Sequence, residues 1–130
     1  MLDQTGFYNQ LCRILSKEQI FCKEPMSRHT TFRVGGPADY YLTPRPEQAA
    51  DLLQLCRREQ MPYHVIGNGS NLLVGDQGIR GAVVAFAKPA AQITVSGNYV
   101  TAGAGALLSQ TAAAAFQAGL GGMEFAAGIP

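Results

Sequence analysis

Charged residues are scarce in this sequence. Asp, Glu, Lys and Arg together make up 15% of the 130 residues, whereas soluble domains typically contain roughly 25%. A partner domain or a large ligand face that covers part of the surface would explain this scarcity, and an Ala-rich and Gly-rich composition would explain it as well. The formal net charge is +1, and Lys and Arg are scattered along the chain. This distribution argues against binding to nucleic acid.

Long apolar runs and metal-ligand patterns are also missing. No run reaches the roughly 18 apolar residues of a membrane-spanning helix, and the N-terminus has no basic segment followed by an apolar one, so we expect a cytoplasmic protein with no membrane contact. The cysteines, Cys12, Cys22 and Cys56, are odd in number and form no CxxC pair. We expect reduced thiols in the core. Two histidines are too few for a metal cluster, and we expect His64 to be a strand residue whose ring nitrogen has a partner.

The chain length predicts one domain with a real core. Hydrophobic periodicity and turn residues predict, in order, a helix over 3–17, strands over 30–34 and 38–42, a helix over 46–60, strands over 63–67 and 81–86, a hairpin of 92–96 with 99–103, and a helix over 106–119. The order strand, helix, strand across 38–67 predicts a βαβ unit with a right-handed crossover.

The stretch "GNGSN", residues 67–71, interrupts an apolar strand with five small or polar residues. Successive glycines permit positive φ angles, so several backbone N–H groups can converge on an anion. The Rossmann fingerprint needs a third glycine where Leu72 stands, and no phosphate loop ends in Gly-Lys-Ser/Thr. Spacing alone favours a tight turn, with a phosphate nest as the alternative.

Three further features have two interpretations each. The stretch "AGAGA", residues 102–106, is either a phosphate site before a helix or a close-packed strand-to-helix joint, and taken alone it favours the joint. Arg33 would pair with a phosphate or lie solvated at a strand end. Glu124 stands alone in an apolar segment, where a capping or supporting role is favoured over acid–base chemistry. No Ser-His-Asp or Cys-His arrangement is present, so the visible chemistry is binding.

Taken in order, "HTTFRVGGPADYYLTP", "YHVIGNGSNLLVGDQGIRGAVV", "VTAGAGALLSQTAAAAFQAGLGG" and "MEFAAGIP" resemble the N-terminal part of the UDP-N-acetylenolpyruvoylglucosamine reductase family. These are flavoenzymes of bacterial peptidoglycan precursor synthesis, and hence of cell wall biogenesis. The likeness covers residues 29–130 with matching order and spacing. It resolves the turn-or-nest alternative in favour of a ligand loop.

The resemblance implies an α+β protein of α/β lobes with the FAD-binding fold of the vanillyl-alcohol-oxidase and p-cresol-methylhydroxylase type, truncated in this chain. It implies a helix and lead-in over 1–28 and an FAD-binding domain over 29–130 that is incomplete at its C-terminal end, with the substrate domain absent. The glycine loop should approach the FAD pyrophosphate. The residues implied to contact FAD are Thr31, Arg33, Gly35, Gly67, Asn68, Gly69, Ser70, Asn71, Leu72, Gly128, Ile129 and Pro130.

The resemblance also implies a reaction in two halves. NADPH reduces FAD, and the flavin then returns a hydride to the enolpyruvyl double bond of the UDP-sugar while an acid protonates the neighbouring carbon. The family's proton-donating serine and its substrate-polarising arginine and glutamate lie after the Gly-Ile-Pro loop. We therefore assign no catalytic residue to this chain and expect it to be inactive alone.

Two alternatives to a truncated reductase are considered. The chain could be a free-standing, non-catalytic flavin-binding module, or a relic that binds nothing. An oxidase of the same FAD superfamily lacks support, because the usual histidine attachment site for flavin has no clear counterpart in the sequence.

Overall fold

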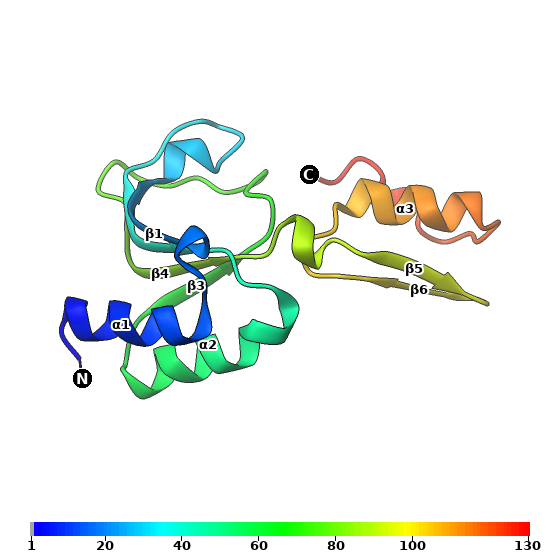
Figure 1. Ribbon diagram of the computed structural model, residues 1–130. Coiled ribbons are helices and arrows are strands. Elements are labelled where there is room, and N and C mark those ends of the chain that lie inside the picture. Colours follow the sequence, from blue (N-terminus) through cyan, green and yellow to red (C-terminus); the bar gives the residue numbers. More distant parts are fainter. Residues whose placement is uncertain (1) are drawn as a thin grey trace.

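The computed structural model describes residues 2–130, which form two lobes joined by a narrow connection (Figure 1). The first lobe contains a four-stranded sheet in the order β1-β2-β4-β3. β1 runs antiparallel to β2, and β4 runs parallel to both β2 and β3. The strands are β1 (Ile20–Pro25), β2 (Pro37–Leu42), β3 (Tyr63–Ile66) and β4 (Ile79–Ala85).

Two helices lie side by side on one face of this sheet (Figure 1). α1 (Gln4–Ile14) starts where the Asp3 carboxylate accepts a hydrogen bond from the Gly6 N–H at 2.7 Å, which satisfies one free donor of the first turn. α2 (Pro46–Arg58) begins with proline, whose missing N–H is unneeded at that position. The sequence predicted both helices, and each ends two or three residues earlier than expected.

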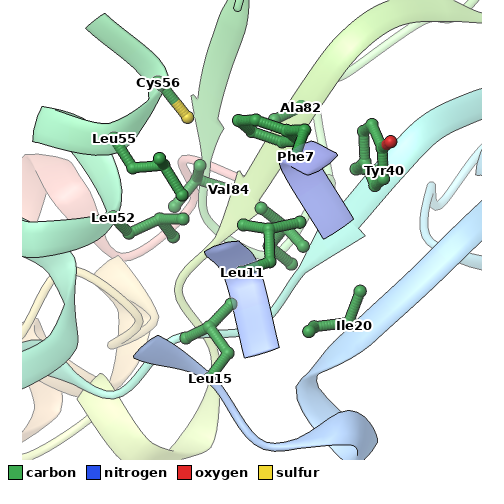
Figure 2. Packing of buried hydrophobic residues seen from close by; sticks show 11 residues of the cluster. Phe7, Leu11, Leu15, Ile20, Tyr40, Leu52, Leu55, Cys56, Ala82 and Val84 are labelled. Carbon is green, nitrogen blue, oxygen red and sulfur yellow. The ribbon is translucent and has the colours of Figure 1, made fainter. Parts of the chain in front are cut away.

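The main core lies between these helices and the sheet (Figure 2). Residues spaced by one helical turn on α1 and α2 meet the side chains of β2 and β4. The Phe7 ring packs on Tyr40 with centroids 5.2 Å apart. The buried members are Phe7, Leu11, Leu15, Ile20, Tyr40, Leu42, Leu52, Leu55, Cys56, Ala82 and Val84. Because α1 contributes to the same core as β2, residues 2–28 pack as part of the first lobe.

A smaller cluster covers the opposite face of the sheet. Successive strand residues point to opposite faces, so Tyr40 enters the main core while Tyr41 enters this second cluster. Its buried members are Met26, Ala38, Tyr41, Val74, Val83 and Ala85. The two central strands, β2 and β4, are therefore buried on both faces, as is typical of parallel strands, whereas the edge strands β1 and β3 are largely exposed or half-buried.

The predicted βαβ unit is present with one strand inserted. β2, α2 and β3 follow one another in sequence, and β2 and β3 run in the same direction because both pair parallel with β4. β4, which comes later in the chain, lies between them. The predicted handedness of the crossover stays a prediction.

The second lobe is a hairpin with one helix. β5 (Ile93–Ser96) and β6 (Tyr99–Ala102) pair antiparallel around Gly97, whose φ of 58° suits the turn. α3 (Leu108–Gln117) packs on both strands. The helix ends in a Schellman motif, in which the Leu120 N–H donates to the Ala115 carbonyl and Gly119 has a φ of 74°. The predicted hairpin and C-cap are confirmed.

The "AGAGA" stretch connects β6 to α3 and packs against the segment around η3 that joins the two lobes. The Gly103 N–H donates to the Gln92 carbonyl at 2.8 Å, and the Gly105 N–H donates to the Ala90 carbonyl at 3.0 Å. A Cβ atom at either glycine would overlap a backbone carbonyl of the facing segment. The close-packed joint, which the stretch favoured when considered alone, is confirmed.

Short 3₁₀ turns connect the main elements: η1 (Lys17–Gln19), η2 (Met26–Arg28), η3 (Lys88–Ala90) and η4 (Glu124–Ala126). None of the helices in residues 2–130 is both long and apolar enough for a membrane span. The same residues contain no group of three or more His, Cys, Asp or Glu side chains arranged to hold a metal ion.

The predicted strand over 30–34 is wrong, and the strand that pairs with β2 is β1 instead. The Thr30 hydroxyl donates to the Val34 carbonyl, and the Arg33 N–H donates to the Thr30 carbonyl, so the segment closes on itself as a turn. The φ of Arg33 is 55°, which lies outside the extended region of regular strands. Local hydrogen bonds therefore override the β-branched composition.

Two expectations about single residues are also corrected. The three cysteines are free, but only Cys56 lies in the core, while Cys12 is half-buried and Cys22 is exposed on the edge strand β1. His64 does lie in a strand, β3, but its side chain is exposed, so its ring needs no protein partner.

Candidate functional site

The glycine loop lies where parallel strands end. Gly67 and Asn68 directly follow β3, whose parallel neighbour β4 ends at Ala85. In α/β sheets, ligands bind outside the carboxyl ends of the strands. The chain therefore places the loop at the edge of the sheet where a ligand site is expected.

A cavity of about 820 Å³ opens beside this loop. Its wall comes from two segments far apart in sequence, the loop that follows β1 and the loop that follows β3, together with one residue of β2 and one after β4. The lining residues are Ser27, Arg28, His29, Thr30, Thr31, Arg33, Tyr41, Gly67, Asn68 and Ala87. Hydroxyl, guanidinium and amide groups thus face a single space.

A second cavity of about 500 Å³ adjoins the first, since both are lined by Asn68 and Ala87. Its far wall belongs to the second lobe, with Leu107 and Gln110 at the start of α3. The two cavities form one elongated cleft that runs from the first lobe to the second. We call this space the interlobe cleft.

The two loops of the first lobe are fastened to each other through Gly69. The Thr31 N–H donates to the Gly69 carbonyl at 3.2 Å. Gly69 is buried with a φ of 68°, and a Cβ atom there would overlap the His29 carbonyl oxygen. Gly67 differs, because its nearest neighbour would be the Ala104 carbonyl oxygen at 3.8 Å. Gly69 thus allows close packing of protein on protein, whereas Gly67 faces the interlobe cleft.

The implied cofactor residues fall into three groups. Thr31, Arg33, Gly67 and Asn68 line the cavity. Gly35, Gly69 and Leu72 support the loops from behind: Gly35 has a φ of 135°, a Cβ there would lie 2.8 Å from Val74, and Leu72 packs on the second cluster. The remaining five, Ser70, Asn71, Gly128, Ile129 and Pro130, line neither cavity.

The charge at the cleft is mainly positive. Arg28 and Arg33 line the larger cavity and Lys88 lines the smaller. Within residues 2–130, no carboxylate forms a salt bridge with Arg33. Arg33 lies in the loop beside the cavity and has a left-handed backbone, with a φ of 55°, which is unusual for a residue other than glycine. This arrangement suits an anionic ligand.

Two residues that line the cavity, His29 and Tyr41, form a connected group with Glu24 of β1. The His29 ring stacks on Tyr41 with centroids 3.8 Å apart and planes inclined by 17°. Glu24 Oε1 lies 3.0 Å from His29 Nε2. Burial raises the pKa of the Tyr41 hydroxyl, and the Glu24 carboxylate raises it further, so Tyr41 stays neutral at physiological pH.

Glu124 lies outside the residues that line the interlobe cleft. Its carboxylate accepts a hydrogen bond from the Gly122 N–H at 2.8 Å at the start of η4. The backbone N–H of Glu124 itself and that of Gly122 lower the pKa of this exposed carboxyl. No side chain of residues 2–130 caps η4 by a hydrogen bond, so the expected capping or supporting role of Glu124 stays a prediction.

Sequence reasoning missed His29 and Tyr41 as parts of the site. A signal existed for Tyr41, since alternation along "ADYYL" places it on the face opposite Tyr40. No local pattern pairs His29 with Tyr41, because the pairing depends on how the turn after β1 folds over β2. The smaller cavity was missed for a similar reason, because its lining combines residues of the first lobe, of the segment that joins the lobes and of the second lobe.

Residues 37–130 match the model of a protein family described as "FAD binding domain". The chain belongs to this FAD-binding family. The match includes β2, the glycine loop and the whole second lobe, and it fits the elongated, positively charged cleft between the lobes.

Curated relatives point to one kind of FAD enzyme. The UDP-N-acetylenolpyruvoylglucosamine reductase of Clostridium perfringens (strain 13 / Type A) is 50% identical over 125 residues, which are 95% of this chain and 41% of the relative. That of Clostridium botulinum (strain Langeland / NCTC 10281 / Type F) is 48% identical over 126 residues, 96% of this chain and 41% of the relative. The resemblance seen in the sequence is confirmed. The chain spans about two fifths of the length of these relatives.

Solved structures confirm the fold. The UDP-N-acetylenolpyruvylglucosamine reductase of Thermus caldophilus superposes with a TM-score of 0.64 at 38% identity, covering 82% of this chain and 36% of that one. p-Cresol methylhydroxylase superposes with a TM-score of 0.62 over 92% of this chain and 26% of that one, at 16% identity, and so shows the fold alone. The α+β fold of the vanillyl-alcohol-oxidase type is therefore the fold of this FAD-binding family member.

The residues of the interlobe cleft fit FAD. A dinucleotide is long, anionic in its middle and flat at both ends. The cleft is elongated, its two parts meet at Asn68 of the glycine loop, and arginines flank the larger cavity. Cofactor sites are typically such clefts with a few converging polar groups.

Proposed function

We propose that this chain is the FAD-binding portion of a reductase that converts UDP-N-acetylglucosamine enolpyruvate to UDP-N-acetylmuramate in the cytoplasm, with NADPH as the reductant. One observation carries the proposal: the glycine loop borders a cleft between two lobes, in a chain about half identical to reductases of that name. Bound FAD would supply the hydride transfer to the enolpyruvyl double bond.

The residues of this chain would bind and orient the cofactor. Gly67 and Asn68 would offer backbone and amide donors to the pyrophosphate, with Thr31 and Arg33 on the facing loop. The neutral Tyr41 and the stacked His29 would close the base of the cavity. Leu107 and Gln110 would form the wall of the second lobe.

We further propose that the chemical step needs residues beyond this chain. We assign no proton donor and no group that polarises a substrate carboxylate to residues 1–130. The domain boundaries at 28 and 29, the incompleteness of the FAD domain after Pro130, and a separate substrate domain that binds the UDP-sugar are part of this proposal. Ser70, Asn71 and Gly128–Pro130 would contact FAD once that part is present.

The experiment has two arms. A titration of the purified chain with FAD should give saturable binding at one FAD per chain, with an affinity below that of a complete family member. NADPH oxidation with the enolpyruvyl substrate should stay at the background rate. Turnover above background would contradict the inactivity of the chain, and the absence of FAD binding by the folded chain would contradict the cofactor function.

The second candidate is a free-standing flavin-binding module without a reductase partner. The interlobe cleft supports this second candidate as well, because Thr31, Arg33, Gly67 and Asn68 line the cavity without any substrate domain. Adding the remaining part of a close relative as a separate chain discriminates the two: restored turnover supports the reductase portion, and FAD binding without any turnover supports the module.

A further inference from the structure

The imidazole of His29 is held by two contacts, although His29 lies in a loop. His29 directly follows η2 and stacks on Tyr41 of β2 at 3.8 Å, with the two rings nearly parallel. Glu24 of β1 holds the same ring at 3.0 Å through Nε2. Glu24 is itself largely buried, with 14% of its side chain exposed. Two contacts from two different strands therefore set both the position and the plane of this ring.

One face of the ring remains available to a ligand. Tyr41 is buried and covers one face of His29, while the His29 side chain keeps 25% of its surface exposed. Both residues line the cavity of about 820 Å³ together with Gly67 and Asn68. A flat ring with one face packed and one face open to a cavity is a stacking surface of the kind that binds bases and other heteroaromatic rings.

We propose that the open face of the His29 imidazole stacks on a planar heteroaromatic ring of the bound dinucleotide, and that Glu24 is the positioning residue that holds the imidazole for it. This inference rests on the proposed FAD function. Arg28 and Arg33 line the same cavity, so a phosphate subsite adjoins the ring subsite. The ring is either the adenine or the isoalloxazine, since stacking recognises the flat ring that both share.

The test separates the ring of His29 from its hydrogen bond. His29→Phe keeps a flat ring and loses the contact with Glu24, whereas His29→Gln keeps a donor for Glu24 and loses the ring. FAD titration should give a smaller loss of affinity for His29→Phe than for His29→Gln, because the ring is kept and only its contact with Glu24 is lost. For His29→Gln the affinity should fall about tenfold, within the roughly 5- to 150-fold range of one stacked ring.

The matched control is His64→Gln, which changes the second histidine of the chain, exposed on β3 and outside both cavities. Its FAD affinity should be unchanged. Circular dichroism and thermal unfolding confirm that each variant is folded. Riboflavin and ADP, titrated separately, identify the ring: the ligand whose affinity falls in His29→Gln carries the stacked one.

Glu24 is tested by rescue. Glu24→Ala should weaken FAD binding, because it releases the imidazole, and Glu24→Gln should restore it, because the amide oxygen still accepts from His29 Nε2. A purely structural role would lower the melting temperature of Glu24→Ala without a change in FAD affinity, and that result overturns the positioning role.

If the unmodified chain binds no FAD, the proposed function fails and the inference fails with it. If the unmodified chain binds FAD and His29→Gln binds it equally well, the stacking inference alone is overturned. A loss of affinity in His29→Phe with none in His29→Gln would show that the hydrogen bond matters and the ring does not, which also overturns the stacking inference.

Discussion

Two glycines of the same loop, Gly67 and Gly69, are expected to respond oppositely to alanine. At Gly69, alanine must adopt a φ of 68°, and its Cβ overlaps the His29 carbonyl oxygen. The left-handed backbone alone costs roughly 1–2 kcal/mol for a residue with a Cβ, and the overlap forces the two loops apart. We therefore expect Gly69→Ala to lower the free energy of unfolding by about 2 kcal/mol or more.

Gly67→Ala serves as the matched control for stability. Its φ is not in the left-handed region, and the nearest atom to an added Cβ is the Ala104 carbonyl oxygen at 3.8 Å, an ordinary contact. The stability of Gly67→Ala should equal that of the unmodified chain, or exceed it by a few tenths of a kcal/mol, because alanine restricts the unfolded chain. A larger side chain, as in Gly67→Val, should lower FAD affinity because it projects into the interlobe cleft.

Thermal unfolding followed by circular dichroism measures the difference. For a chain of this size, about 2 kcal/mol corresponds to a fall of roughly 5–10 °C in melting temperature for Gly69→Ala. Equal melting temperatures for Gly67→Ala and Gly69→Ala would refute the assignment of Gly69 to packing between the loops. A fall in Gly67→Ala alone would reverse the roles of the two glycines.

Three further predictions concern the core, the thiols and the acid response. Leu52 is fully buried in the main core, so Leu52→Ala should lower the free energy of unfolding in urea by about 2–5 kcal/mol. Iodoacetamide at pH 8 should modify the exposed Cys22 well before Cys56, since burial raises the pKa of Cys56 to about 11, and mass spectrometry of a time course would show the order. Glu124 has a folded pKa below its ordinary value of 4.5, so its stabilisation is complete above that pH and is lost as pH falls through the folded pKa. The stability difference between the unmodified chain and Glu124→Gln should accordingly vanish in acid; a difference that persists there would contradict this sign.

Periodicity and turn chemistry were sufficient to predict most of the elements. α2 shows why: its buried residues recur at helical spacing, and proline starts it. Residues 30–34 show the limit, because Thr30 bonds to the Val34 carbonyl and keeps a β-branched segment out of any strand. The β1 strand was missed because it pairs with β2 across the intervening residues 26–36, and no local pattern reveals that pairing.

The candidate site was predictable only in its glycine loop. Local composition marked Gly67 and Asn68, and the resemblance assigned them to FAD. It could not distinguish Gly67, which faces the cleft, from Gly69, which faces the His29 backbone, because that difference depends on where another segment lies. The stacked pair of His29 and Tyr41 joins residues on different elements and leaves no pattern in the chain.

The most direct test of the central claim, that FAD binds between the two lobes, is hydrogen–deuterium exchange of the chain with and without saturating FAD. FAD bound between the lobes should slow exchange in three separate segments: residues 27–33 and 67–72 of the first lobe and residues 104–110 of the second. Protection confined to one lobe, or no protection in the glycine loop at saturation, would contradict it.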